Sequence, residues 1–517
     1  MTLNRLYSSL ILWVLIISLL GPANAAEKTD SQTLVVGEIW DIEGLDPASG
    51  HSVTVNDKAL IVETLIGVDE SFNLKPLLAT SWKSIDDKTW EIDIREGVKF
   101  HDGSELTADD VKFSIERANE LDLTVRSLLK LDSIEVLDPY TIRIRTTSPN
   151  SIMPAILHYA SIAIISPRSI DDDGEFGELI GTGPFKLESF DPQTHILTVT
   201  KNDNWWGGEV KLNRIILKPI TDPNTRALAL ESGDVDFTVD VPYSEAERID
   251  EIDGVNVEKY STPRIYRIEI NLKHAPLDDV RVRQAISSAI DRDEIAEYVL
   301  FNVGSPATGP FMADMFWANE NIKSYDYDID LARELLDEAG WNDSDGDGIR
   351  DKDGKPLELS LLTYIERPGL QPMAEALAGQ LEDVGIKIHA EAVENGVSSD
   401  RQKKGDWDLY LSATNTGMVP DPLYYLGLTY GTDGSSNKAD YSNSRVDSII
   451  RQAYETEDQE ERIKMLDELE EIVQEDLPVI IVANYGVAIA KKDYVKGYVF
   501  DPTAHDYRLS PDMYIED

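Results

Sequence analysis

Residues 79–117 place a strand, a turn and a helix in close succession, and this run constrains the fold more than any other part of the sequence. Trp90, Ile92 and Ile94 alternate with charged residues, which predicts a half-buried strand. An Asp-Gly pair then predicts a turn. Thr107, followed by two aspartates, predicts the N-cap and first turn of a helix, where the helix dipole favours negative charge.

The first 26 residues predict a secretion signal. Arg5 supplies the positive start, residues 10–20 form a short apolar run, and residues 23–25 (Ala-Asn-Ala) match the small-x-small cleavage rule. The run is shorter than the roughly 20 apolar residues that a membrane span needs. Since no second long apolar run follows, we expect a soluble chain in the periplasm or at the cell surface. The sequence leaves open whether the leader is cleaved or retained as an anchor.

The composition excludes several classes of protein. The chain has no cysteine, which rules out disulfides, a lipid anchor on a mature N-terminal cysteine, thiolate metal sites and thiol catalysis. Its formal net charge is −48, from 96 acidic and 48 basic residues. Nucleic acid is excluded as a partner, because phosphates require basic patches. The acidity either solvates the surface or concentrates cations, and solvation is the favoured interpretation.

Several motifs resemble, in the same order, those of the family 5 extracellular solute-binding proteins, the oligopeptide, dipeptide and nickel receptors of ABC importers. The motifs are residues 79–117, IGTGPF (180–185), NDNWWG (202–207), ITDPNTRALALESGDVDF (220–237), NLKHAPLDDVRVRQAISSAID (271–291), YDIDLARELLDEAGW (327–341) and PDP (420–422).

This resemblance implies an α/β fold in the form of a large two-lobed, class II type periplasmic-binding-protein clamp with mixed sheets. It implies a first lobe of residues 27–265 plus 488–517 and a second lobe of residues 266–487, joined by two crossings of the chain. It also implies an ABC permease and ATPase subunits as membrane partners, a small-molecule ligand held in the cleft, and a monomeric protein. From the residues themselves we also expect residues 54–69 to form a helix.

No catalytic constellation stands out in the sequence. GxSxG, HExxH and the phosphate-cradling GxxxxGK[ST] are all missing. Carboxylates are so abundant that a catalytic pair cannot be singled out among them. We therefore expect the chain not to be an enzyme.

Two of the seven histidines are candidates for metal ligands. His51 lies in the loop after the first expected strand, and His505 lies in the closing segment DPTAHDY. The resemblance to nickel-binding members implies that these two imidazoles coordinate the metal while a small chelator, such as free histidine, completes its shell. Ni²⁺ accepts such mixed nitrogen and oxygen ligands. The alternative is two ordinary surface histidines.

A chelator with free carboxylates needs a cation in the cleft. Arg367 follows a strand that the family turns into the cleft, and its guanidinium can grip a carboxylate with two hydrogen bonds. Arg264, at the expected crossing between lobes, is the second candidate. Tyr364, Tyr266 and Trp40 are candidates for aromatic walls, although such residues are more often part of a core.

The sequence departs from two kinds of relative. Peptide receptors place an aspartate before the PDP motif to pair with the peptide amine, whereas Met418 stands near that position here. A buried ammonium without a countercharge is costly, so the peptide ligand is the second choice. The arginine, tryptophan and histidine residues of the best-known enterobacterial nickel receptors have no clear counterparts. We therefore expect a nickel chelate as ligand, with a peptide or another small solute as the alternative.

One loop outside the expected cleft follows a calcium-binding rhythm. Asp343, Asp345 and Asp347 alternate before a glycine, and Asp351 stands at the position that binds calcium through water. Gly354 occupies the twelfth position, where an EF-hand has a bidentate glutamate, so the shell is incomplete. A plain surface loop is the favoured interpretation, and a structural Ca²⁺ is the alternative.

Overall fold

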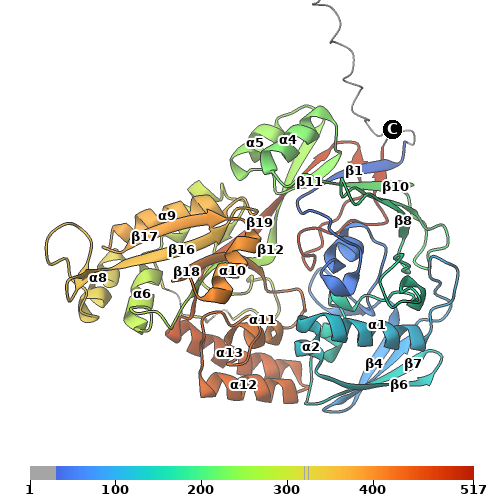
Figure 1. The fold of residues 1–517 in the computed structure, drawn as a ribbon, viewed down its shortest axis with the longest axis horizontal. Coiled ribbons are helices and arrows are strands. Elements are labelled where there is room, and N and C mark those ends of the chain that lie inside the picture. Colours follow the sequence, from blue (N-terminus) through green and yellow to red (C-terminus); the bar gives the residue numbers. More distant parts are fainter. Residues whose placement is uncertain (1–30, 320, 324, 517) are drawn as a thin grey trace, which may run out of the picture.

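A computed structural model describes residues 31–319, 321–323 and 325–516, and the ribbon has a left and a right part joined in the middle (Figure 1). The expected secretion signal and its cleavage site lie outside the described residues. Among the described residues, no helix has the length and apolar character needed to cross a membrane.

The elements alternate between strands and helices along the chain. The strands are β1 (Thr33–Glu38), β2 (Ile66–Val68), β3 (Leu74–Pro76), β4 (Ala79–Asp86), β5 (Thr89–Ile94), β6 (Leu131–Asp138), β7 (Thr141–Thr146), β8 (Phe185–Phe190), β9 (Leu197–Lys201), β10 (Arg214–Pro219), β11 (Phe237–Val239), β12 (Val255–Ile270), β13 (Ser305–Pro306), β14 (Asp351–Lys352), β15 (Lys355–Pro356), β16 (Glu358–Tyr364), β17 (Lys387–Val393), β18 (Leu409–Asn415), β19 (Val479–Lys492), β20 (Val495–Lys496) and β21 (Tyr514–Ile515). The α-helices are α1 (Ala108–Leu121), α2 (Leu123–Leu129), α3 (Met153–Ile156), α4 (Pro223–Ser232), α5 (Ala246–Asp250), α6 (Val280–Ser288), α7 (Arg292–Glu294), α8 (Ile329–Glu338), α9 (Leu370–Glu382), α10 (Asn395–Lys404), α11 (Pro422–Tyr430), α12 (Ser444–Glu455) and α13 (Gln459–Asp476). Short 3₁₀ turns are η1 (Pro47–Ser49), η3 (Ala160–Ile162), η4 (Pro167–Ser169) and η5 (Tyr243–Glu245), and π-helical turns are η2 (Thr54–Lys58) and η6 (Ile295–Val299).

The largest sheet of the described residues runs through both parts of the molecule. It has eleven strands in the order β17-β16-β18-β12-β19-β11-β1-β10-β9-β8, with β13 beside β19. β1 is parallel to β10 and β11, whereas β12 is antiparallel to β18 and β19. The predicted α/β fold with mixed sheets is therefore confirmed.

Two long strands carry the chain across the middle of the molecule (Figure 1). β12 has 16 residues and β19 has 14, and they pair with each other along most of their length. Their register shifts between Ser261 and Ile265 and again between Tyr266 and Arg267, and such bulges bend a strand. The expected lobe boundaries at 265/266 and 487/488 fall inside these two strands, and the lobe division stays a prediction.

The strand, turn and helix expected within residues 79–117 are confirmed. Trp90, Ile92 and Ile94 of β5 are buried in the four-stranded sheet β4-β5-β7-β6. Thr107 is the N-cap of α1, and its backbone N–H donates to the Asp110 carboxylate at 2.8 Å. That bond satisfies a donor that the first turn of a helix leaves without an intrahelical partner.

The helix expected over residues 54–69 is wrong for most of its length. Helical structure stops at Lys58, and Leu60 has a φ of 53°, which a right-handed helix does not allow. The next backbone groups bond instead to the IGTGPF motif, where Gly183 N–H donates to Ile61 O at 3.0 Å. A Cβ on Gly183 would lie 2.2 Å from Leu60 O, so this close approach requires glycine.

A buried glutamate joins two of the sequence motifs. Glu63, 7% exposed, accepts hydrogen bonds from the indole N–H groups of Trp205 at 3.2 Å and Trp206 at 2.9 Å. It also accepts one from the Thr182 hydroxyl at 2.7 Å. Burial raises the pKa of Glu63 to about 7, against the lowering effect of these donors.

The two parts also touch each other away from the crossing strands. Phe72, on the turn between β2 and β3, is buried with its ring centre 5.4 Å from that of Trp317 in an edge-to-face arrangement. Ser151 donates from its hydroxyl to Ala453 O at 2.9 Å and from its backbone N–H to Tyr454 O at 3.0 Å. The two Ser151 bonds join the first part to α12, and the Phe72–Trp317 contact is a further link between the parts.

We expect Glu63 to make the fold less stable as the pH rises toward neutrality. Its native pKa of about 7 lies above the ordinary value of 4.5, so between these values the folded state binds the proton more tightly than the unfolded state. The contribution is present below the unfolded pKa and is lost as the pH rises through the folded pKa, by about 3 kcal/mol in total. Urea unfolding of the parent and of Glu63→Gln from pH 4.5 to 8 measures it. Parallel pH curves for the two proteins would contradict this assignment.

Candidate functional site

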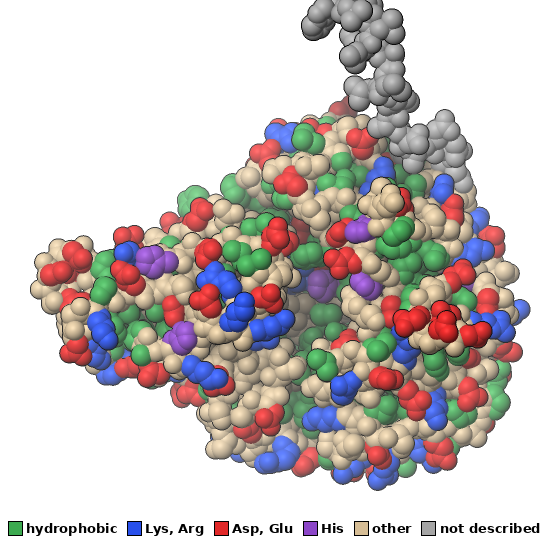
Figure 2. Space-filling model, in the orientation of Figure 1, with side chains coloured by type: hydrophobic (Ala, Val, Ile, Leu, Met, Phe, Trp, Pro, Cys, Tyr) green, Lys and Arg blue, Asp and Glu red, His purple; other side chains and the backbone are tan. Residues whose placement is uncertain are grey.

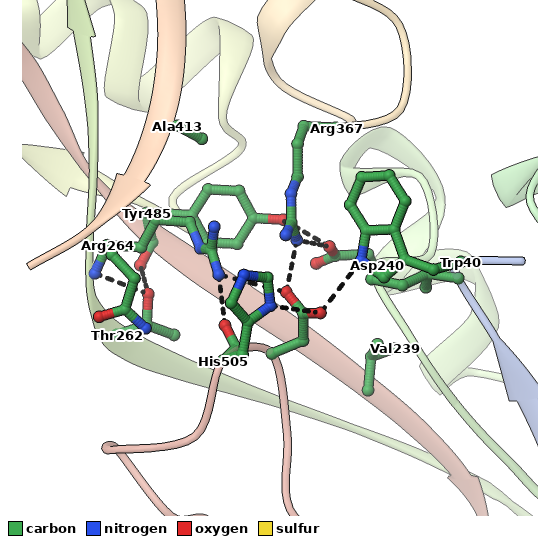
Figure 3. Close-up of polar contacts among 12 residues, drawn as sticks. Trp40, Val239, Asp240, Thr262, Arg264, Arg367, Ala413, Tyr485 and His505 are labelled. Carbon is green, nitrogen blue, oxygen red and sulfur yellow. Dashed lines mark hydrogen bonds and ion pairs between the residues drawn. The ribbon is translucent and has the colours of Figure 1, made fainter. Parts of the chain in front are cut away.

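Side chains from distant segments meet beside the two crossing strands (Figure 3). Trp40 follows β1, Arg264 lies on β12, Arg367 follows β16, and His505 and Asp506 come from the closing segment. The strands β1, β12, β16 and β19 belong to one continuous sheet, and the closing segment packs beside it.

The carboxylate of Asp506 is the centre of this cluster. Its side chain is 1% exposed. The groups around it are Arg367 Nη1 at 2.7 Å, His505 Nδ1 at 3.0 Å, Trp40 Nε1 at 3.2 Å, Arg264 Nη2 at 3.3 Å and Lys58 Nζ at 3.6 Å. Burial by itself would raise the pKa of Asp506, but Arg367, His505 and Lys58 outweigh it and lower the pKa well below its usual range. Asp506 is therefore ionised, and it neutralises cations that three different segments bring to it.

A second carboxylate, Asp240, approaches the same arginine from the end of β11. Its Oδ2 lies 3.2 Å from Arg367 Nη1 and accepts a hydrogen bond from the Tyr485 hydroxyl at 2.5 Å. Its Oδ1 is buried and has no hydrogen-bond partner in the structure. Burial raises the pKa of Asp240, although Arg367 acts in the opposite direction. A buried acceptor without a hydrogen bond is costly, so a ligand that donated a hydrogen bond to Oδ1 would remove this cost.

The two arginines are buried and stacked on aromatic rings. Their side chains are 4% exposed for Arg264 and 2% for Arg367. The Arg367 guanidinium lies 5.1 Å from the Trp40 ring centre, and both guanidinium groups lie 5.5 Å from that of Tyr485. Arg264 Nη2 also donates to the backbone oxygen of His505. Arg367 Nε is buried without a partner, which leaves one N–H available to an anionic ligand.

The imidazole of His505 has a defined tautomer. Because an ionised carboxylate can only accept, Nδ1 carries the proton that it donates to Asp506, and Nε2 keeps its lone pair. Burial lowers the pKa of His505, partly offset by Asp506. A neutral imidazole whose second nitrogen bonds a carboxylate is the usual form of a histidine that binds a metal ion.

Charge is balanced across the extended cluster. Lys58 bonds Glu38 at 2.6 Å, and the Tyr507 hydroxyl donates to the same carboxylate at 2.7 Å. With the two arginines opposite Asp240 and Asp506, three cations therefore meet three carboxylates. Buried charges are tolerated only when they are paired in this way.

The structure brings together four of the seven residues that the sequence singled out. Trp40, Arg264, Arg367 and His505 share the contacts just described. Tyr266 reaches them indirectly: it is fully buried, its ring centre lies 5.1 Å from that of Tyr485, and its hydroxyl is hydrogen-bonded to that of Tyr243 at 3.2 Å.

The other two singled-out residues contact different groups. The hydroxyl of Tyr364 is hydrogen-bonded to the backbone of Ala413, 3.4 Å from its O and 3.3 Å from its N. The ring of His51 lies against Gly44, where a Cβ would come 2.6 Å from Nε2. The segments of His51 and His505 are linked through Asp57, whose Oδ2 accepts from His505 N–H at 3.4 Å. Coordination of one metal by both imidazoles stays a prediction.

Sequence reasoning missed the two carboxylates that organise the cluster. Asp506 is the residue after His505 within the quoted closing segment, and Asp240 follows the 220–237 motif. A single acid flanked by valines, as at Asp240, is a usable sign of a buried and paired carboxylate. Nothing in the sequence shows that the two acids share Arg367.

A small pocket borders this cluster, and a larger cavity shares residues with that pocket. The cavity, of about 390 Å³, is lined only by residues of the first part and the closing segment, and these include His158 and Arg508. The small pocket, of about 10 Å³, lies beside His505 and shares His158 and Arg508 with the cavity. Figure 2 shows a hollow between the left and right parts with histidine side chains at its border.

The aspartate loop after α8 is an exposed group of three carboxylates. Asp343, Asp345 and Asp347 form the only cluster of at least three potential metal-binding side chains in the described part of the chain. Each accepts a backbone N–H of its own loop, and Asp351 binds Ser344 instead of joining the group. The arrangement fits a surface loop, and a bound Ca²⁺ stays a prediction.

Comparison with known proteins assigns the chain to one family. The sequence profile of the bacterial extracellular solute-binding proteins, family 5 (middle), matches residues 73–437. The glutathione-binding protein GsiB of Escherichia coli (strain K12) is 30% identical over 455 residues, which covers 85% of this chain and 86% of GsiB.

Two solved structures show the same fold. NikA from Staphylococcus aureus, crystallised in complex with Ni(L-His)₂, is 26% identical with a TM-score of 0.82, covering 94% of this chain and 100% of NikA. NikZ from Campylobacter jejuni, in complex with Ni(L-His), is 26% identical with a TM-score of 0.79, covering 90% and 95%. The two-lobed α/β fold of periplasmic binding proteins is therefore confirmed.

We expect Asp506→Asn to lower the free energy of unfolding by about 3–5 kcal/mol, because it leaves buried cations without their countercharge. The native pKa of Asp506 is lowered, so its contribution is complete above the unfolded pKa of about 3.9 and disappears as the pH falls through the native value. Urea unfolding should therefore show a larger difference from the parent at pH 7 than at pH 3, because only part of the contribution is lost between the unfolded pKa and pH 3.

Asp203→Asn is the matched control, because Asp203 is 77% exposed and lies 3.6 Å from Lys201. It should leave the unfolding free energy almost unchanged. An Asp506→Asn protein as stable as this control at pH 7 would refute the central role of Asp506.

Proposed function

We propose that this chain, which belongs to the bacterial extracellular solute-binding proteins of family 5, captures nickel as a complex with a small amino-acid chelator such as free histidine. Proteins of this family are transport receptors rather than enzymes, and they work outside the cytoplasm with ABC permease and ATPase subunits. The proposal therefore concerns the ligand that the receptor delivers.

The observation that carries this proposal is the pairing of His505 with Asp506 beside two buried arginines. The Nδ1–Asp506 hydrogen bond directs the lone pair of Nε2 away from the carboxylate, ready for a metal ion. Arg264 and Arg367 supply guanidinium N–H groups that suit the carboxylates of a chelator. Imidazole, carboxylate and amine donors together satisfy Ni²⁺. The likeness to NikA and NikZ, whose structures contain nickel–histidine complexes, supports the same assignment.

The arrangement of strands suggests how the ligand is held. Trp40, Asp240 and His505 belong to the first part of the chain and its closing segment, whereas Arg367 follows β16 in the second part. A ligand that bonds both sets would hold the two parts together. The bulged strands β12 and β19 connect these parts and are the place where they could move. Closure of this kind, around a hinge made of a few residues, is typical of clamp receptors.

Glutathione or a short peptide is the second candidate ligand. The likeness to GsiB, 30% identical over 455 residues, favours it. The unpartnered Oδ1 of Asp240 also suits a ligand ammonium group. Both candidates carry α-amino and carboxylate groups, so the buried arginines and Asp240 can bind either one. The imidazole of His505 is the group that favours the nickel complex over a peptide.

A ligand panel tests the choice. Isothermal titration calorimetry with Ni²⁺ plus L-histidine, with glutathione and with dipeptides should show tight binding of the nickel complex alone. Arg367→Gln should weaken that binding by about thirtyfold or more, the loss typical of removing one partner of a buried charge pair. Arg445→Gln, which removes an exposed arginine bonded to Glu468, is the control and should bind like the parent. Preferential binding of glutathione or a dipeptide would replace nickel with the second candidate.

The role of His51 has its own test. His51→Asn removes the imidazole, and Gly44→Ala keeps it but places a Cβ where the His51 ring now lies. If His51 coordinates the metal, both variants should weaken nickel–histidine binding by about tenfold or more. Gly44 has no positive φ, so alanine fits its backbone. Affinities equal to that of the parent in both variants would remove His51 from the metal site.

A further inference from the structure

A buried histidine, His158, shares the small pocket with the half-buried His505. The pocket of about 10 Å³ is lined by His158 and His505 together with Asp57, Arg508 and Met418, and His51 is not among its lining residues. This volume is large enough for one water molecule or one ion of similar size. A single ion suits such a space, and a chelator would have to bind that ion from outside the pocket.

His158 is held in one orientation by the first part of the molecule. It follows α3, is 5% exposed, and donates from Nδ1 to the backbone oxygen of Ile66 in β2 at 3.1 Å. A carbonyl oxygen only accepts, so the proton is on Nδ1 and Nε2 keeps its lone pair. Burial lowers the pKa of His158 to about 4, with Arg508 as a further cause, so the ring is neutral at neutral pH.

The described histidines outside this pocket and the His51 loop form hydrogen bonds or ion pairs with other groups. Both ring nitrogens of His101 bond the glycine motif, at Gly181 and Gly183. His195, His274 and His389 each bond a surface carboxylate. His158 and His505 are thus the two histidines of the described chain that line one pocket while each keeps Nε2 as an acceptor.

The charges around the pocket do not oppose a cation. Arg508 donates to Asp57 at 2.6 Å and to Asp501 at 2.7 Å, so its charge is matched by two carboxylates. Within the described residues, no third histidine or acid completes a three-ligand cluster with the pair. The protein therefore offers two imidazoles, and the remaining positions around a metal belong to the chelator.

We infer that His158 is a further direct ligand of the transported metal, binding through Nε2 in the pocket that it shares with His505. This inference rests on the proposed function. Both histidines belong to the first part and the closing segment, whereas Met418, which also lines the pocket, belongs to the second part. The metal would therefore bind to a pair of imidazoles that exists before the two parts come together.

His158→Asn separates the structural hydrogen bond from metal binding. The side-chain amide of asparagine can replace Nδ1–H as the donor to Ile66 O, but it has no nitrogen at the position of Nε2. Calorimetry of the full chain with Ni²⁺ and two equivalents of L-histidine should show at least about tenfold weaker binding than the parent. X-ray absorption of the nickel complex should show one imidazole fewer, with thermal unfolding of the metal-free protein unchanged.

Two comparisons make the outcome decisive. His389→Asn removes an exposed histidine and should bind nickel like the parent. His158→Gln provides the same test if the asparagine variant is unstable. Nickel binding within twofold of the parent and an unchanged imidazole number would overturn the role of His158 and leave the proposed function intact. A parent protein that binds no nickel, with or without histidine, would instead refute the proposed function.

Discussion

The candidate site depends on one buried carboxylate, that of Asp506. Arg264, Arg367 and Lys58 bring positive charge from separate segments into a space that is almost closed to water, and such charges are tolerated only with a matching anion. Asp506 supplies that anion and also fixes the tautomer of His505. One side chain thus sets both the electrostatic balance of the cluster and the nitrogen that remains available for a ligand.

This arrangement explains why the site suits a ligand with mixed charge. The cations and carboxylates of the cluster already balance, so a ligand that carried only negative charge would upset the balance. A metal chelate or an amino-acid derivative brings both signs and can replace internal pairs without leaving a buried charge alone. Arg367 Nε has no partner, so a ligand acceptor would be stabilised by bonding it. Asp240 Oδ1 also has none, so a ligand donor would be stabilised there.

The choice between nickel and glutathione depends on a few atoms rather than on the fold. Relatives with the same architecture include proteins named for glutathione and structures that contain nickel–histidine complexes. Fold therefore identifies a receptor but not its ligand. What distinguishes the two here is a neutral imidazole at His505 and, in the same pocket, another at His158, because peptides have no need of an uncommitted nitrogen lone pair.

The sequence by itself determined the strand, turn and capped helix of residues 79–117 and the family motifs, because side-chain alternation and helix caps are local. It also pointed to Arg264, Arg367, Trp40 and His505. It misread residues 54–69 as a helix, because an apolar pattern cannot show that the backbone bonds a distant glycine motif. Only the tertiary structure decided that Asp506 and Asp240 share Arg367 and that His158 and His505 line one pocket. These pairings join segments more than a hundred residues apart, and only the tertiary packing brings them together.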